Sequence, residues 1–169
     1  MARVSTKENK NEYQVRREEL GLSREKASEL LETITPERIE RIESEKTTAY
    51  PDEVLLMSEK YKDPHLCNYY CANECAIGKK LVPEIKIKDL SLIVLEMLAS
   101  LNSMKKRQER LIEISADGRI EADEVEDFIT IQQELEKISI TVEALQLWAE
   151  QKISCGEIDI EAYNSAKNK

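Results

Sequence analysis

The residues best suited to chemistry lie in one short segment near the middle of the chain. It contains the single histidine and three cysteines spaced four residues apart: His65, Cys67, Cys71 and Cys75. Thiolate sulfur and imidazole nitrogen are the ligands of structural zinc sites, and thiolates also hold iron–sulfur clusters. One interpretation is therefore that these four residues bind zinc or an iron–sulfur cluster.

Two other interpretations of the cysteines stay open. On a helix, residues i and i+8 share a face but lie about 12 Å apart along the axis, too far for one ion with metal–sulfur bonds of about 2.3 Å. Ligation by all three thiols thus requires a broken helix or a loop. Otherwise the thiols pack in a small core, as cysteine often does, or one pair of them forms a reversible disulfide.

The composition predicts an all-α protein. The absence of catalytic motifs predicts that it is not an enzyme. Four glycines and four prolines in 169 residues leave few turns, which is typical of helices with short connections. The chain has no phosphate-binding glycine loop and no nucleophile elbow. It also has no apolar run of about 18 residues and no signal peptide, so we expect a cytoplasmic protein that does not enter a membrane.

The net charge of −9 is unevenly distributed along the chain. Residues 1–62 hold 12 Lys and Arg against 14 Asp and Glu, whereas the remainder holds 13 against 20. A nearly neutral N-terminal part binds nucleic acid weakly through charge alone, because non-specific binding depends on neutralised phosphates. Specific contacts or dimerisation would have to supply the affinity.

Helix signals are clear in the N-terminal part. Residues 1–10 are polar and are expected to form a disordered arm. A first helix from Asn11 to Glu19 ends at Gly21, Ser23 caps a second helix, and Thr35 with Pro36 opens a third. Pro51 starts a fourth helix. The second and third helices are short and joined by a tight turn, which is typical of the helix-turn-helix unit.

This pattern resembles the lambda-repressor-like, xenobiotic-response-element family of helix-turn-helix transcriptional regulators over roughly residues 13–63. The residues that carry the resemblance are Leu20-Gly21-Leu22-Ser23, Ile39-Glu40-Arg41-Ile42-Glu43, Lys46, and Pro51 followed by Val54-Leu55-Leu56. The resemblance implies a DNA-binding domain over residues 11–63, whose third helix enters the major groove of double-stranded DNA.

The resemblance also implies which residues touch DNA. Arg24 would contact a backbone phosphate at the start of the second helix, and Lys46, Thr47 and Thr48 would lie beside phosphates after the third. The residues that would face or flank the groove are Pro36, Glu37, Arg38, Glu40 and Arg41. Two of these are glutamates, and Glu45 replaces the family's glycine. The alternative is a protein-interaction adaptor that reuses the fold without binding DNA.

The C-terminal part is expected to be a long antiparallel helical hairpin. A cysteine-rich connector over residues 64–83 precedes residues 84–169, in which two helices, about 86–115 and 122–152, flank a turn at Asp117-Gly118. Apolar residues follow the heptad spacing of a coiled coil in both helices. They are Ile87, Leu90, Val94, Met97, Leu101, Met104 and Leu111 in the first, and Val125, Phe128, Ile131, Leu135, Ile138, Val142, Leu145 and Ala149 in the second.

The first of these helices is apolar on more than one side, so a single hairpin leaves apolar surface uncovered. A second copy would cover it in a four-helix bundle, and repressor-like proteins use dimers to span two half-sites. The alternative is that the apolar faces cover the N-terminal domain within a monomer. The sequence thus predicts a dimeric DNA-binding transcriptional regulator, responsive to metal or redox state through the Cys/His segment.

Overall fold

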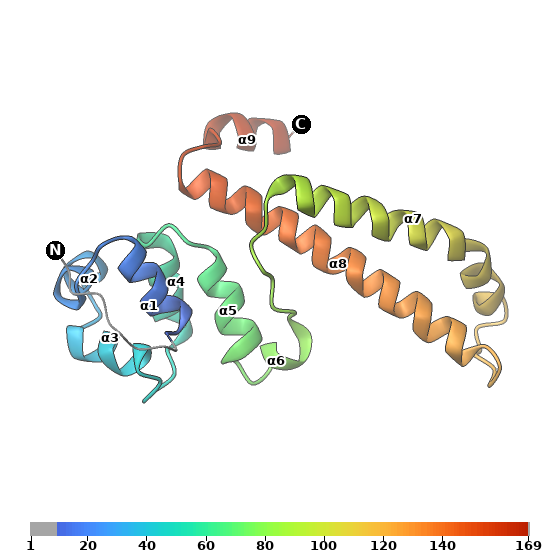
Figure 1. Cartoon of the computed structure of the whole chain (residues 1–169), viewed down its shortest axis with the longest axis horizontal. Coiled ribbons are helices and arrows are strands. Elements are labelled where there is room, and N and C mark those ends of the chain that lie inside the picture. Colours follow the sequence, from blue (N-terminus) through green and yellow to red (C-terminus); the bar gives the residue numbers. More distant parts are fainter. Residues whose placement is uncertain (1–9, 169) are drawn as a thin grey trace. The chain divides into compact units, whose positions relative to one another are not determined.

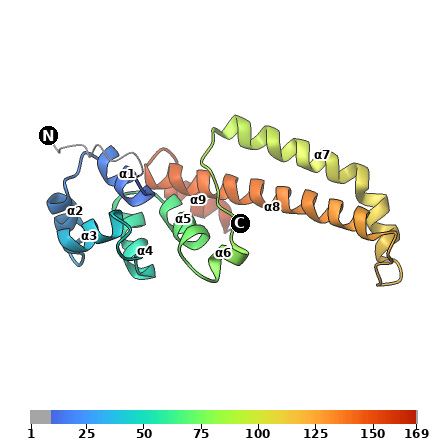
Figure 2. The same cartoon turned by 60° about the horizontal axis from the view of Figure 1, so that its bottom comes forward.

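The protein was analysed as a computed structural model that describes residues 10–168. Within this range the chain forms nine helices and no strand, as the prediction of an all-α fold requires (Figures 1 and 2). Residues 1–9, which make up most of the expected disordered arm, lie outside the described residues. The chain divides into two compact units, one formed by residues 1–85 with 149–169 and the other by Lys86–Trp148.

The first unit consists mainly of short helices, of which α1 to α5 supply its buried core. Its helices are α1 (Glu12–Glu19), α2 (Arg24–Leu31), α3 (Pro36–Glu43), α4 (Pro51–Lys60), α5 (His65–Asn73), α6 (Gly78–Leu81) and, near the end of the chain, α9 (Ile160–Lys167). The fully buried residues of the core are Tyr13, Ala27, Leu31, Ile34, Ile39, Ile42, Ala49, Val54, Met57, Tyr61 and Leu66. Leu66 belongs to α5, so the segment that carries the cysteines packs on this core.

The predicted helix boundaries in this unit are confirmed by their caps. The side chains of Asn11, Ser23 and Thr35 each accept a hydrogen bond from the first turn of α1, α2 and α3. Gly21 follows α1 with φ of +67°, a conformation that favours glycine. Its N–H bonds to the Glu18 carbonyl at 2.9 Å. Local capping chemistry therefore sets the short connections that bring α2 and α3 together.

A close approach between backbones fixes α6 against α5. A Cβ atom added to Gly78 would lie 2.0 Å from the carbonyl oxygen of Cys71. The Gly78 N–H also donates to the Cys75 sulfur at 3.4 Å. The turn after α5 therefore folds back tightly onto the helix of the cysteines, and it depends on a residue without a side chain.

The second unit is an antiparallel pair of long helices. It holds α7 (Leu90–Ser115) and most of α8 (Val125–Ser154), joined by the turn at Gly118. Ile93 and Ile114 of α7 and Ile131 and Thr141 of α8 are buried between them. The expected hairpin is thus present. The seam, however, passes through Ile93 and Ile114, which the predicted stripe of α7 omits.

The last residues of α8 belong to the first unit. Gln151 Nε2 and Ser154 Oγ donate to the carbonyl of Lys62, at 3.0 and 3.2 Å. The Arg16 guanidinium donates to the neighbouring carbonyl of Tyr61 at 2.9 Å. The turn between α4 and α5 is therefore held through its backbone by both α1 and the end of α8.

The turn after α3 generates a first prediction. The Glu45 and Lys46 N–H groups bond to the carbonyls of Ile42 and Arg41, both at 3.0 Å, in the motif that commonly ends a helix with glycine. Glu45 holds φ of +59° at the glycine position. Because this conformation costs a residue with a side chain about 1–2 kcal/mol, we expect Glu45→Gly to stabilise the protein by about 0.5–1 kcal/mol after the entropic cost of glycine.

Chemical denaturation measures this change, and Glu45→Ala is the matched control. Alanine removes the same carboxylate but keeps a Cβ in the left-handed conformation. Equal stability of the two variants would show that charge, and not backbone conformation, governs this position.

Candidate nucleic-acid interface

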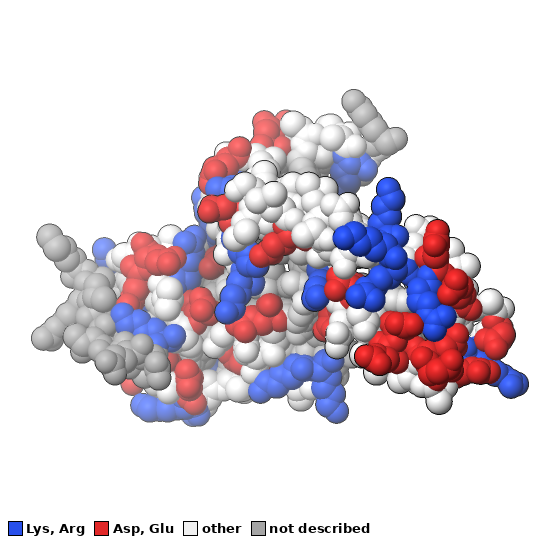
Figure 3. Space-filling model, turned by 45° about the vertical axis from the view of Figure 1, so that its right-hand side comes forward, with Lys and Arg blue, Asp and Glu red and all other residues white. Residues whose placement is uncertain are grey.

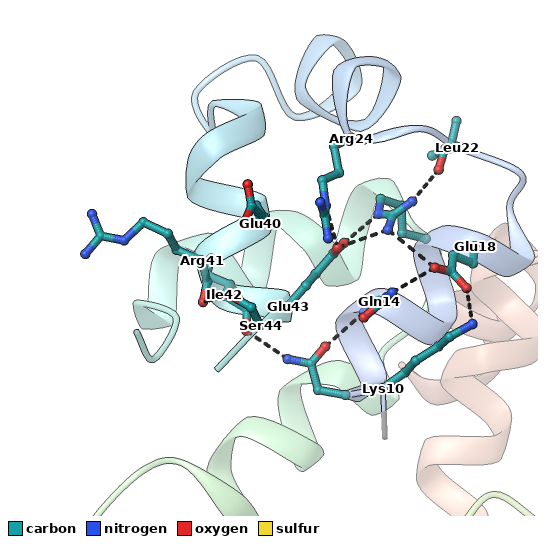
Figure 4. A network of polar contacts seen from close by, with 12 residues as sticks. Lys10, Gln14, Glu18, Leu22, Arg24, Glu40, Arg41, Ile42, Glu43 and Ser44 are labelled. Carbon is teal, nitrogen blue, oxygen red and sulfur yellow. Dashed lines mark hydrogen bonds and ion pairs between the residues drawn. The ribbon is translucent and has the colours of Figure 1, made fainter. Parts of the chain in front are cut away.

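A buried carboxylate orients α3 in the first unit. Glu43, 1% exposed, lies at the end of α3 and accepts hydrogen bonds from Arg17 Nε at 2.5 Å and Nη2 at 3.0 Å. Arg24 Nε donates to it at 2.9 Å (Figure 4). Burial opposes the charge of Arg17, but its bonds to Glu43 outweigh this and raise the Arg17 pKa. One carboxylate therefore ties together α1, α2 and α3.

Arg24 remains suited to a phosphate contact in this arrangement. Its side chain is 35% exposed, and its Nε–H is committed to Glu43. Neither of its two Nη groups makes a hydrogen bond in the described part of the chain. The ion pair thus orients the guanidinium at the start of α2 while leaving four N–H donors available.

Arg38, by contrast, is committed to the fold. Its guanidinium donates to Glu53 at 2.6 and 2.7 Å, to the Thr47 hydroxyl at 2.7 Å and to the Thr48 carbonyl at 3.0 Å. It also lies 4.7 Å from the centre of the Tyr50 ring. The bond to Glu53 raises the Arg38 pKa despite some burial. Arg38 therefore holds α3 against the start of α4, and the Thr47 hydroxyl contributes by accepting one of its hydrogen bonds.

The outer surface of α3 carries both signs of charge. Glu37, Glu40 and Arg41 are exposed and Pro36 is half-buried. Lys46 reaches Glu40 at 3.5 Å, with both side chains largely in solvent. Within the described part of the chain Arg41 has no ion-pair partner, and Figure 4 shows its side chain directed away from the helices around it. Arg41 is consequently the groove candidate with a free guanidinium.

An acidic pocket lies beside the end of α3. It has a volume of about 280 Å³ and is lined by Asn11, Ile42, Glu45, Thr47, Thr48, Tyr69, Asn73 and Glu74. Burial and the charges of Glu74 and Glu45 raise the pKa of the Tyr69 hydroxyl to about 12. Phosphate is repelled from a pocket of this charge, so phosphate contacts would be limited to Arg24, Arg41 and Lys46, which do not line it.

The expected metal ligands are not assembled into a site. Among the described residues no group of three or more His, Cys, Asp or Glu side chains could hold a metal ion. His65 Nε2 is bonded to the carbonyl of Ile85 at 2.9 Å, and the cysteines follow one another on or just after α5. These residues in this conformation fit neither zinc nor an iron–sulfur cluster, and metal binding stays a prediction for elemental analysis of the purified protein.

The neighbouring cysteines nonetheless influence the Cys71 thiol. Burial raises the pKa of the Cys71 thiol, and the neighbouring Cys75 and Cys67 raise it further. Leu66 of the same helix is fully buried, and Tyr69 packs edge-on against Tyr13 with ring centres 5.5 Å apart. The arrangement favours the interpretation that the cysteines pack beside a small aromatic core.

Sequence reasoning missed Arg17, Glu43 and Asn11 as organisers of the site. Arg17 lies four residues after the buried Tyr13, and Glu43 four residues after the buried Ile39, so both continue an apolar helix face. Opposite charges at such positions on two helices could have indicated a buried ion pair. Asn11 Nδ2 donates to the carbonyl of Ile42 at 2.9 Å, a long-range contact that no local pattern indicates.

Comparisons of the chain with protein-family models, with curated proteins and with solved structures found no match. Of the helices in the described range, none has the length and apolar character needed to cross a membrane. The geometry of the chain itself is therefore the basis for a functional proposal.

The buried ion pair generates a second prediction. Glu43→Ala leaves Arg17 charged and buried without its carboxylate, which typically costs about 3–5 kcal/mol. We expect a loss of about 3 kcal/mol in the free energy of unfolding, measured by chemical denaturation. Glu40→Ala, on the exposed surface of the same helix, is the control and should change stability by less than about 0.5 kcal/mol. Similar effects of the two substitutions would contradict a structural role for Glu43.

The thiols generate a third prediction. A raised pKa lowers the thiolate fraction near neutral pH, and the thiolate is the species that reacts. Cys71 should therefore be alkylated more slowly at pH 8 than the exposed Cys155, and its rate should keep rising above pH 9. Mass spectrometry of iodoacetamide-treated protein measures both rates. Protection of all three central cysteines that a chelator removes would instead indicate a bound metal.

Proposed function

We propose that this chain is a sequence-specific DNA-binding transcriptional regulator that acts as a homodimer. The first unit reads double-stranded DNA with the outer surface of α3, and the helical pair brings two such readers together. Arg41 and Lys46 supply contacts from α3 and the turn after it, and Arg24 binds a neighbouring phosphate. Pro36, Glu37 and Glu40 face the groove, where glutamate can accept a hydrogen bond from cytosine N4.

The observation that carries this proposal is that some arginines are bonded within the chain whereas Arg41 is exposed and unpaired in the described structure. The guanidinium groups of Arg17 and Arg38 form intramolecular hydrogen bonds with carboxylates. The exposed Arg41 has no such partner in the described part of the chain. A guanidinium on the outer face of a short, proline-initiated helix suits bidentate recognition of guanine or a phosphate. The oriented Arg24 lies on the helix that precedes it.

A second candidate function is favoured by the acidity of the same surface. Glu37, Glu40 and Glu45 are exposed around Arg41, and Glu45 and Glu74 line the adjoining pocket. Such a surface would suit a basic segment of another protein, in which case the chain is an interaction adaptor. The two candidates differ in whether removal of negative charge strengthens or weakens binding.

A duplex selected from a random library gives the fourth prediction. Arg41→Ala should weaken binding to that duplex by about 5-fold to 150-fold, since a good base or phosphate contact contributes about 1–3 kcal/mol. Thermal stability should not change, because Arg41 makes no ion pair in the described structure. Fluorescence anisotropy at several salt concentrations measures the affinity, and the salt slope falls by about one if the partner is a phosphate.

Two further variants make this experiment specific. Lys79→Ala removes one exposed positive charge from α6 and should leave the affinity within about twofold. Glu40→Gln should change which base is preferred rather than abolish binding. Failure to enrich any duplex, or equal losses for Arg41→Ala and Lys79→Ala, would overturn the proposal and favour the adaptor.

A further inference from the structure

The helical pair leaves a set of large apolar side chains in solvent. On α7 these include Leu90, Val94, Leu98 and Leu101, and on α8 they include Leu135 and Val142, with Ile112 and Val125 nearer the turn. Their exposed fractions run from 38% to 60%. Several of them belong to the stripes that the sequence analysis placed in the seam. The question is whether they form one continuous face.

Two contacts across the pair locate the opposite face. Arg110 Nε donates to Asp127 at 2.7 Å, and Glu134 is hydrogen-bonded to Ser103. The two contacts are seven residues apart on each helix, so the antiparallel register is uniform. At about 100° per residue, Ser103 and Arg110 lie on one flank of the α7 seam, and Asp127 and Glu134 lie on the matching flank of α8.

The apolar set lies on the other flank of both helices. Leu90, Val94, Leu98 and Leu101 follow one another at steps of four, four and three residues, which keeps them in one stripe. With the buried Ile93 and Ile114 at the seam of α7, this stripe is turned away from Ser103 and Arg110. On α8, Leu135 and Val142 are turned away from Asp127 and Glu134 in the same way. The register places Ile112 level with Val125, Leu101 with Leu135, and Val94 with Val142.

We propose that this face, called here the apolar flank (Leu90, Val94, Leu98, Leu101, Ile112, Val125, Leu135 and Val142), binds the same flank of a second copy of the chain. In the complex, α7 of one copy lies on α8 of the other at equal height, and the four helices form a bundle. In this register Val94, Leu101 and Ile112 of α7 meet Val142, Leu135 and Val125 of the partner's α8 respectively. The role of this dimer, which is to pair two DNA-binding units, rests on the proposed function.

Charge supports this occupant and this register. Lys105 lies in line with Leu98 and Ile112 on the outer side of α7, and Glu136 follows Leu135 on the outer side of α8. Neither has an ion pair within the described range. Placing α7 on the α8 of a second copy brings Lys105 close to the partner's Glu136, and the twofold axis repeats the pair. Packing α7 on α7 would leave both charges without such a partner.

The surrounding charge makes the pairing selective. Residues 105–110 of α7 hold four basic side chains and one acidic one, whereas residues 121–127 hold five acidic and no basic ones. In Figure 3 basic and acidic side chains of this unit gather in separate neighbouring groups. Two equal surfaces related by a twofold axis can match such groups to each other, as isologous interfaces require.

Sedimentation of the full-length protein tests the proposal. We expect a dimer for the natural chain, and we expect Val94→Glu and Leu101→Glu each to raise the dimer dissociation constant at least tenfold. Leu92→Glu is the matched control, because Leu92 is equally an exposed leucine of α7 but precedes Ser103 by eleven residues, about three helical turns, and so lies on the opposite flank. It should leave the dissociation constant within about twofold.

A charge exchange tests the register. Lys105→Glu and Glu136→Lys should each weaken the dimer about threefold, and the double variant should restore it. A monomer at all concentrations, or equal effects of Leu92→Glu and Val94→Glu, would overturn the proposal. Failure of the double variant to restore the dimer would overturn the register in which α7 meets α8.

The same variants separate this proposal from the proposed function. A dimer that responds as expected but binds no selected duplex would refute DNA binding and leave the apolar flank assigned. A monomer that binds a single half-site would refute the dimer and leave DNA binding in place. A defined complex with another protein in place of the dimer would also refute it.

Discussion

The first unit depends on one buried carboxylate. Glu43 sits at the end of α3 with 1% of its surface exposed, and Arg17 and Arg24 both donate hydrogen bonds to it. Desolvating a carboxylate is costly unless its oxygens are paired. The three helices must therefore keep the geometry that pairs it, and the orientation of α3 and of the Arg24 guanidinium follows from the same requirement.

The proposed interface attracts DNA phosphates only weakly through its overall charge and would bind through a few individual side chains. Around Arg41 acidic side chains are exposed beside basic ones, and the adjoining pocket is acidic, so attraction to phosphate cannot dominate binding. Selectivity then rests on the geometry of single side chains. Pairing two readers would multiply this small affinity, because the second contact becomes intramolecular.

The sequence predicted the local features of this structure better than its long-range contacts. Asn11, Ser23, Thr35 and Gly21 fixed helix ends because capping depends on residues three or four positions apart. The roles of Arg38 and Glu43 depend on partners 15 and 26 residues away, which no periodic pattern specifies. The seam of the helical pair was misplaced because α7 is apolar on two sides, and a heptad count cannot tell the buried side from the exposed one.

The backbone contacts at Lys62 have a consequence for how this chain is made. The carbonyl there is bonded by residues of α8 some ninety positions later, and the first unit is accordingly interrupted in sequence by the second. During synthesis its last pieces emerge from the ribosome after the whole hairpin. A gene fragment that stops near residue 85 would keep the buried core of the first unit but lose the side chains that bond the Lys62 carbonyl, and recombination could exchange the hairpin only as an insert between two parts of the same unit.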